Sequence, residues 1–292
     1  MELLDKRDRL ILLILDTDAT APLSAIAKKL KISKEAVLYR IRQLEARGII
    51  LQYVTLSHFA KTGLIQFKVY VQFNTIPNES KQQIIDYLSA TREIGWLAST
   101  EGIFDLMFSV RFRTIFEFED FKDAFCEKFD KVIQNLQIAI LTEAETKPRY
   151  YLLPEYDEDK VTFLHCDKDV PEKLDEEDWK ILLAIATHAR KNSVELEKET
   201  GITQRVIRYR RAELEKKGVI TGYKLAINYR KLGFLFFKCF ITFRNLTNKQ
   251  YQTFREYART NPNIIYWIKT IGSWDAELEI ESASVEEYYA LI

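Results

Sequence analysis

The sequence has few of the residues that usually mark a catalytic or metal site. Its 292 residues include three cysteines, three histidines and nine glycines. Cys126, Cys166 and Cys239 are odd in number and far apart, so they indicate neither a disulfide framework nor a metal cluster and favour a reducing cytoplasm. The histidines lack metal-ligand spacing, and no glycine-rich phosphate loop occurs. We therefore expect no metal, no cofactor and no enzymatic activity.

Long hydrophobic runs are also missing. No stretch of about 20 apolar residues occurs, so we expect no membrane-spanning helix. The N-terminus carries charges from its second residue, unlike a signal peptide. Hydrophobic residues still make up 47% of the chain, which is enough for buried cores. The length predicts more than one domain, since a domain typically has roughly 100–150 residues.

A net charge of either sign is missing as well, because 43 basic residues balance 43 acidic ones. The balance is uneven along the chain. Residues 154–178 hold eleven acidic residues against three lysines, a local net charge of −8, so the remainder carries +8. Local patches set the potential that a partner meets, and the zero total therefore does not exclude nucleic acid.

A long internal repeat organises the chain. A shift of 170 residues aligns residues 4–73 with residues 174–243 without gaps, and 22 of the 70 pairs are identical. Chance similarity between two helical segments would not stay in register across loops and strands. We therefore infer a tandem duplication.

Each copy begins with a helical part. Residues 6–47 show the apolar spacing of three helices, with Pro22 at the entry to the second helix and Ser33 as N-cap of the third. Gly48 ends the third helix. Residues 49–56 form a short extended stretch, as in the wing that follows a recognition helix. A tight turn between the second and third helices is typical of a helix-turn-helix domain.

After Gly63 the apolar period drops to two. Phe67, Val69, Val71 and Phe73 alternate with Lys68, Tyr70 and Gln72, which predicts a half-buried strand. The next segments are predicted as a helix, two strands, a helix and a strand, at residues 80–91, 94–101, 105–112, 115–132 and 137–145. The order β-α-β-β-α-β is the ferredoxin-like arrangement.

The predicted fold class is therefore α+β, with two tandem units that each join a winged helix-turn-helix to a ferredoxin-like domain. The first unit covers residues 1–57 and 58–153, an acidic linker covers 154–173, and the second unit covers 174–227 and 228–292. The second ferredoxin-like domain has no counterpart of its last helix and strand. We expect the natural chain to continue or another chain to supply that strand, because strand 235–244 would otherwise be an open apolar edge.

The third helix of each copy carries the predicted contacts with double-stranded DNA, because this helix lies in the major groove. The predicted contacts are Ser33, Lys34, Glu35, Tyr39, Arg40 and Arg42 in the first copy, and Thr203, Gln204, Arg205, Arg208, Tyr209 and Arg210 in the second. Basic residues on a helix are more often a solvated face. The Tyr-Arg pair at the same position in both copies favours DNA contact, with the arginine on a phosphate.

The two copies differ at two structural positions. Lys31 stands where the second copy has Gly201, so this lysine must adopt a left-handed conformation or reshape the turn. Arg211 replaces the apolar Ile41. The second recognition helix is therefore expected to sit less firmly on its core or to extend that side chain outward.

Three motifs carry a resemblance to a known family. They are the string LD..D..IL, the segment LKISKEAVLYRIRQLEARGII at residues 30–50, and a G-x-[FW]-D turn in both copies. Together they resemble the Lrp/AsnC (feast/famine) family of prokaryotic regulators. The resemblance implies a winged helix-turn-helix followed by a regulatory domain called RAM, and a role in transcription regulation. It also implies an amino-acid or small-metabolite effector at the turns that hold Gly102, Asp105, Gly272 and Asp275.

Relatives with a single unit dimerise through their RAM sheets. This chain is therefore expected to form a pseudo-dimer within itself, or a homodimer, with the two helix-turn-helix heads on one side. We expect the sheets to pack through the apolar faces Phe67, Val69, Val71 and Phe73, and Phe237, Cys239, Ile241 and Phe243. Such heads would suit half-sites about one DNA turn apart, near 34 Å.

Two alternative functions stay open. Siroheme decarboxylase subunits also resemble this family, and that likeness implies a His-Tyr or His-Arg signature at the start of the sensor domain. Here His58-Phe59 and Asn228-Tyr229 occupy that place, and only the first copy has the histidine. A nonspecific architectural DNA binder is the other alternative, with a steep salt dependence and no sequence preference.

Overall fold

The computed structural model describes residues 4–75, 78–155, 162–166 and 170–292. The first copy comprises α1 (Lys6–Thr17), α2 (Leu23–Leu30), α3 (Lys34–Ala46), β1 (Ile50–Ser57), α4 (Phe59–Thr62), β2 (Ile65–Phe73), α5 (Asn78–Ala90), β3 (Ile94–Ser99), β4 (Leu106–Phe112), α6 (Ile115–Lys128) and β5 (Ile133–Thr146). The rest comprises η1 (Tyr150–Leu152), β6 (Phe163–Cys166), α7 (Glu176–Ile185), α8 (Ser193–Thr200), α9 (Gln204–Lys216), β7 (Ile220–Ile227), η2 (Tyr229–Leu232), β8 (Leu235–Ile241), α10 (Asn248–Thr260), β9 (Ile264–Gly272), β10 (Ala276–Ser282) and α11 (Val285–Leu291). This order confirms the α+β class and the tandem arrangement.

Local signals in the sequence account for the ends of the recognition helices. The hydroxyl of Ser33 accepts a hydrogen bond from the backbone N–H of Ala36, so Ser33 caps α3 as predicted. Lys31 has φ of 53°, the left-handed conformation that Gly201 adopts in the second copy with φ of 73°. The expected strained lysine is therefore present in the turn between α2 and α3.

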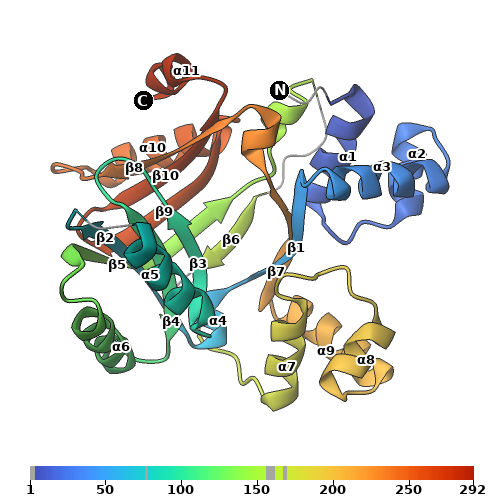
Figure 1. The fold of residues 1–292 in the computed structure, drawn as a ribbon. Helices are drawn as coiled ribbons and strands as arrows, with labels where there is room; N and C mark the ends of the chain where they lie inside the picture. Colours follow the sequence, from blue (N-terminus) through green and yellow to red (C-terminus); the bar gives the residue numbers. More distant parts are fainter. Residues whose placement is uncertain (1–3, 76–77, 156–161, 167–169) are drawn as a thin grey trace.

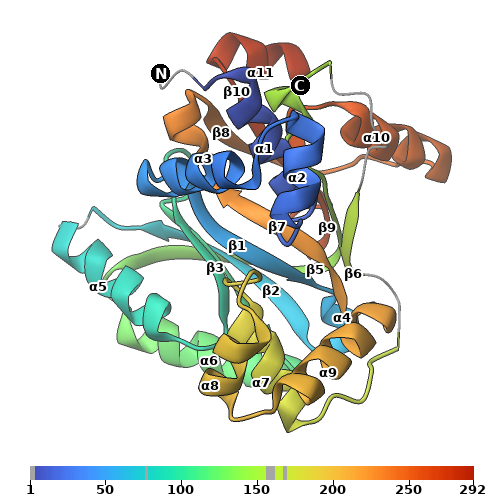
Figure 2. The same cartoon turned by 90° about the vertical axis from the view of Figure 1, so that its right-hand side faces the viewer.

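The two helical heads form one body. Strand β1 pairs antiparallel with β7, so the strand after each recognition helix crosses to its counterpart instead of forming a separate wing hairpin. The backbone N–H of His58 donates to the carbonyl of Val219, and that of Asn228 donates to Ile49, as a matched pair of contacts. A single hydrophobic core contains residues of both heads. Figure 2 shows β1 and β7 crossing between α3 and α9.

The two ferredoxin-like parts share one sheet of eight strands. Its order is β3-β4-β2-β5-β9-β10-β8, with β6 paired to β5, and the antiparallel β5–β9 pair joins the copies. The sheet folds over on itself. Tyr70 on β2 lies 5.4 Å from Phe240 on β8, ring centre to ring centre. A flat sheet would separate these strands by about 19 Å at the usual spacing. In Figure 1 this sheet and its helices lie left of the two heads.

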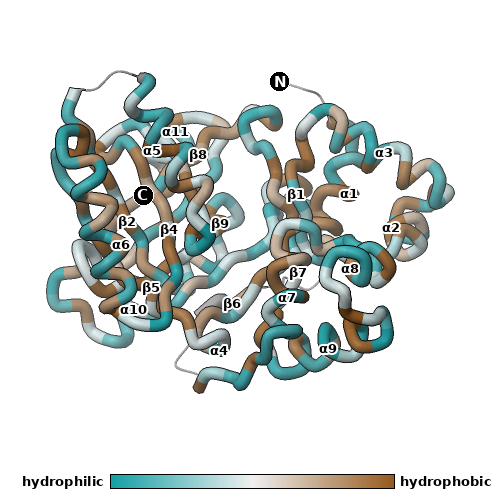
Figure 3. The backbone as a smooth tube through the Cα atoms, turned by 60° about the horizontal axis from the view of Figure 1, so that its bottom comes forward, coloured by the Kyte–Doolittle hydropathy of each residue, from teal (hydrophilic) through white to brown (hydrophobic). Residues whose placement is uncertain are grey.

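The predicted pairing of the two RAM sheets therefore occurs within the chain, but the predicted face is wrong. The apolar side of β2, with Phe67 and Val69, packs against α5 and α6. Its counterpart on β8, with Phe237 and Cys239, packs against α10 and α11. Both crossover helices of a ferredoxin-like unit cover the same face of their sheet, so the opposite face, which carries Lys68 on β2, is left to meet the other sheet. In Figure 3 the strands β2 and β4 are coloured as hydrophobic, whereas the recognition helix α9, in the heads, is coloured as largely hydrophilic.

Part of the predicted acidic linker belongs to the sheet. Phe163 is buried, and β6 pairs with the end of β5. Residues 156–161 and 167–169 of that linker lie outside the described residues. Strand β8 is the last strand in the order of the sheet among the described residues, and the sequence predicts an edge strand at this segment. None of the described helices has the length and apolar character needed to cross a bilayer.

Candidate nucleic-acid interface

The outer faces of α3 and α9 carry most of the predicted DNA contacts. On α3 the inner residues Val37, Ile41 and Leu44 are buried, which turns the opposite face to solvent. Tyr39 is 64% exposed and its counterpart Tyr209 is 67% exposed, unusual for such large rings. The other exposed members of the predicted set are Ser33, Lys34, Glu35 and Arg42, and Thr203, Arg205 and Arg208.

The repeated arginine does not lie with this exposed group. The guanidinium of Arg40 bonds Asp5 at 2.8 Å and Asp8 at 2.7 Å, which ties α3 to the start of α1. Arg210 repeats the arrangement with Asp175 at 2.7 Å and Asp178 at 2.9 Å, and adds Glu177 at 2.6 Å. The sequence predicts that these two guanidinium groups bind DNA phosphates. In the structure both are paired with carboxylates of their own heads.

A signal for this pairing exists in the sequence. The same Asp5–Asp8 spacing recurs at 175 and 178, always with the arginine 35 and 32 residues later. The first of these aspartates also caps its helix, since the Asp5 carboxylate accepts from the N–H of Asp8. The hydrogen bond that Arg40 donates to Asp8 raises the pKa of Arg40 against the effect of burial, so the ion pair persists across the physiological range.

Glu35, Gln204 and Arg208 of the predicted set make short-range hydrogen bonds within their own heads. The pKa of Glu35 is lowered by its own backbone N–H and by the Ser33 hydroxyl, so its carboxylate is charged at neutral pH. Gln204 donates to the Glu197 carboxylate at 2.7 Å. Arg208 donates to the Ser193 hydroxyl at 3.2 Å. Thr203 precedes α9 without a side-chain cap bond.

Arg211 does not extend outward as expected, because its guanidinium bonds groups of its own head. Its guanidinium lies 4.7 Å from the centre of the Tyr223 ring, and its Nε donates to the Tyr223 hydroxyl at 2.9 Å. The charge that replaces the apolar Ile41 of the first copy thus lies on an aromatic face.

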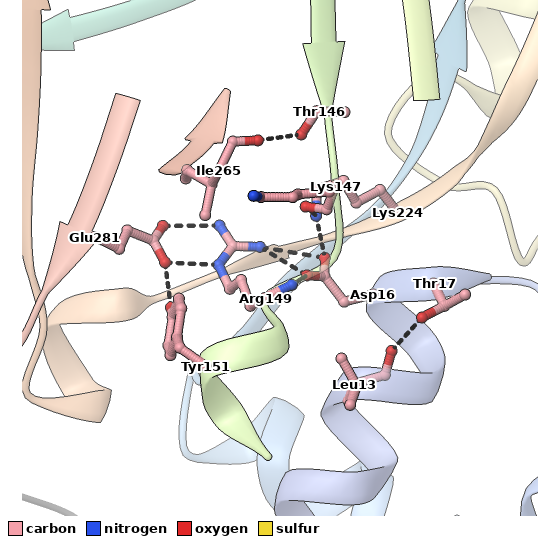
Figure 4. A network of polar contacts seen from close by, with 10 residues as sticks. All are labelled: Leu13, Asp16, Thr17, Thr146, Lys147, Arg149, Tyr151, Lys224, Ile265 and Glu281. Atoms are coloured by element: carbon pink, nitrogen blue, oxygen red, sulfur yellow. Dashed lines mark hydrogen bonds and ion pairs between the residues drawn. The ribbon is translucent and has the colours of Figure 1, made fainter. Parts of the chain in front are cut away.

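A buried polar cluster joins the first head to the sheet (Figure 4). Arg149, just past β5, bonds the Glu281 carboxylate of β10 through Nε at 2.9 Å and Nη2 at 3.0 Å. The same guanidinium reaches Asp16 of α1, 3.2 Å from Oδ1. Lys224 of β7 also bonds Asp16 at 2.9 Å, and the Tyr151 hydroxyl donates to Glu281. We call these five residues the junction cluster. Sequence reasoning missed all of them.

A second buried polar cluster lies between the two halves of the folded sheet. The Glu277 carboxylate of β10 accepts from Lys68 of β2 at 2.5 Å and lies 2.9 Å from Lys238 of β8. The hydroxyl of Tyr70 and the indole N–H of Trp274 also donate to it. All five of these side chains are buried. This cluster fixes the pairing of the two RAM sheets.

The predicted effector turns contain residues with clear structural roles. The Asp105 carboxylate accepts from the backbone N–H of Phe73 at 2.8 Å, and Asp275 accepts from Phe243 at 2.7 Å. Each aspartate thus holds the end of the first strand of its own copy. Gly102 has φ of 125° and Gly272 has φ of 146°, which side chains rarely adopt.

Gly272 is expected to tolerate a side chain less well than Gly102. A methyl group at 272 would lie 2.5 Å from the carbonyl oxygen of Ile138 on β5, whereas nothing lies within 4 Å at 102. Both alanine variants bear backbone strain of about 1–3 kcal/mol. The difference between their losses of stability therefore reports on the contact between β9 and β5. Urea unfolding should show Gly272→Ala as the less stable. Equal losses would mean that the close β5–β9 approach has no energetic consequence.

The best-formed cavity among the described residues is small. It has a volume of about 10 Å³ between β5, α10 and β9, and Glu145, Lys147 and Trp267 are among its lining. Ligand pockets usually measure roughly 300–1,000 Å³. His58, the residue that bears on the decarboxylase alternative, is buried at the start of α4.

The two heads match a known type of domain. Residues 4–50 and 174–221 both match the family described as winged helix-turn-helix DNA-binding. An uncharacterised HTH-type transcriptional regulator of Pyrococcus horikoshii is 31% identical over 121 residues, which is 40% of this chain and 79% of that protein. The proline dehydrogenase transcriptional activator of Rhodobacter capsulatus is 32% identical over 121 residues and is covered to 77%. The chain belongs to the Lrp/AsnC family of DNA-binding transcriptional regulators.

Two further comparisons set limits on what this membership implies. The regulator LrpA of Pyrococcus horikoshii is 46% identical over 61 residues, but the match spans only 43% of LrpA and 21% of this chain. The crystal structure of the siroheme decarboxylase NirDL superposes with a TM-score of 0.59, covering 98% of this chain and 85% of that one. At 14% identity, this likeness to NirDL concerns the tandem fold alone.

Proposed function

We propose that this Lrp/AsnC protein is a sequence-specific regulator that binds duplex DNA with α3 and α9 at once. The observation that carries the proposal is the fixed pair of heads. The β1–β7 pair and the shared core hold both heads on one side of the molecule, and each recognition helix exposes its outer face there (Figure 2). A pair of reading heads is what single-unit regulators obtain by dimerising.

The contacts proposed for base reading are the exposed residues of the N-terminal halves of the two helices, with Tyr39 and Tyr209 as shared elements. Arg40 and Arg210 are proposed to act indirectly, by holding α3 on α1 and α9 on α7. The effector hypothesis stays a prediction, since the hydrogen bonds of Asp105 and Asp275 account for both residues without a ligand.

We expect the double variant Arg205→Ala/Arg208→Ala to weaken binding to a footprinted duplex. Both side chains carry positive charge on the exposed face of α9. Each lost phosphate contact should make the negative slope of log K against log salt shallower by about one. A lost base contact should reduce sequence preference instead. Lys128→Ala is the matched control, because it removes an exposed charge from α6, on the side of the molecule away from the heads (Figure 1).

The experiment also separates the alternatives. A steep salt slope with equal affinity for all sequences would assign the chain to the architectural binders. Failure to bind any duplex, together with saturable binding of an iron porphyrin, would contradict the proposal and support a decarboxylase-like function. NirDL itself has been crystallised in complex with an iron-uroporphyrin III analogue.

A further inference from the structure

The two recognition helices present different side chains at equivalent positions. Within residues 34–42 and 204–212, four positions on the outer faces differ in charge or polarity between the copies: Lys34 and Gln204, Glu35 and Arg205, Leu38 and Arg208, and Arg42 and Ala212. The exposed Tyr39 and the ion-paired Arg40, with its partners Asp5 and Asp8, are repeated instead. The duplication has therefore kept the Asp-Asp-Arg contact that holds each recognition helix and changed much of the surface around it.

One chain always presents one head of each kind. The antiparallel β1–β7 pair, the matched backbone bonds of His58 and Asn228, and the common core fix α3 and α9 relative to each other. A dimer of identical single units presents the same surface twice and fits a palindrome. This chain has no such constraint, because its two heads are encoded separately.

We infer that the operator of this protein is non-palindromic, with two half-sites of different base sequence. This inference rests on the proposed function. The charged carboxylate of Glu35 can only accept hydrogen bonds, so it favours the amino group of cytosine and disfavours a phosphate. Arg205 at the same helix position has only donors and favours O6 and N7 of guanine. Leu38 suits a thymine methyl group, where Arg208 offers a cation.

The test begins with selection of the full chain against a duplex library with a random stretch of about 30 base pairs, roughly three helical turns. The selected operator is divided into the half under α3 and the half under α9 by footprinting. Three duplexes are then compared: the selected operator and the two palindromes made from one half alone. The selected operator should bind about tenfold or more tightly than either palindrome, as expected from one or two lost base contacts.

A converted chain gives the second readout. The variant K34Q/E35R/L38R/R42A gives α3 the reading residues of α9 and should shift the preference to the palindrome of the α9 half-site. The reciprocal variant Q204K/R205E/R208L/A212R should shift it to the other palindrome. Ala46→Lys is the control, because it copies Lys216 at the exposed C-terminal end of α3 and should leave the preference unchanged.

The outcomes keep the two proposals apart. Selection of a palindrome, or equal binding of all three duplexes by the wild-type chain with clear preference over random DNA, would overturn the non-palindromic operator and leave the proposed function intact. Absence of any selected sequence would remove the proposed function itself. Converted chains that keep the wild-type preference would show that these four positions do not read bases.

Discussion

The Glu277→Gln variant is expected to lose about 3–5 kcal/mol of its free energy of unfolding, a large share of a typical stability of roughly 5–15 kcal/mol. Glutamine keeps the size of the side chain but removes the negative charge between Lys68 and Lys238, both buried. Only Glu279 would then face the two ammonium groups, 2.6 Å from Lys238. Removing one partner of a buried ion pair leaves the other charge without compensation.

The same residue should govern stability in acid. Burial alone would raise the pKa of Glu277, but Lys68 and Lys238 lower it from 4.5 to about 2. A depressed carboxylate pKa stabilises the folded chain above the unfolded value and loses that contribution as the pH falls toward the folded value. Stability should therefore fall between about pH 4.5 and pH 2, by about 3 kcal/mol for this one group.

Urea titrations at several pH values provide the measurement, and Glu79→Gln on the surface of α5 provides the control. The control should follow the wild type, whereas Glu277→Gln should be less stable at neutral pH and show a flatter acid limb. A Glu277→Gln chain as stable as wild type at pH 7 would mean that the cluster between the two sheets contributes nothing to their pairing.

The helical heads could be predicted because their signals are local. Ser33 and Pro22 lie within a few residues of the helices they begin, and the left-handed Lys31 is implied by the glycine at its repeat position. The repeat doubled every such signal. The crossing of β1 to β7 could not be read in this way, because a strand's partner is chosen by contacts far away along the chain.

The sheet shows why the rest could not be predicted. The alternation of Phe67, Lys68, Val69 and Tyr70 indicates two faces and suggests that the lysine faces water. In the structure Lys68 is 3% exposed, because its partner Glu277 arrives from 209 residues along the chain. Apolar character identified a buried face correctly, but a polar residue with a distant partner has no signature in its own segment.

The recognition helices illustrate an ambiguity of a different kind. A repeated arginine on a basic helix can serve a phosphate or a carboxylate equally well, and charge count alone favours the phosphate. The geometry pairs Arg40 with Asp5, which caps α1, and with Asp8 in the first turn of the same helix. The residues proposed to read bases are therefore the exposed ones around Arg40.

The junction cluster gives the second large expected effect, and the chain supplies its own control. Asp16 and Lys224 are buried and paired, but the repeat places Ala186 and Val54 at the equivalent positions of the opposite side. The buried ion pair of one side thus has two apolar residues as its counterparts on the other. Since burial lowers the pKa of Lys224 to about 8, its charged form depends on Asp16.

The Asp16→Ala variant should therefore lose about 3–5 kcal/mol, since Lys224 and Arg149 would share the single carboxylate of Glu281. The double variant Asp16→Ala/Lys224→Val, which copies the residues of the other side, should recover much of that loss, because it removes both charges and leaves the Arg149–Glu281 pair intact. Thermal and urea unfolding of the two variants and of Lys224→Val alone complete a double-mutant cycle. Additive losses, with the double variant less stable than either single one, would show that the Asp16–Lys224 pair is not a coupled unit and that the first head is held to the sheet by its apolar contacts alone.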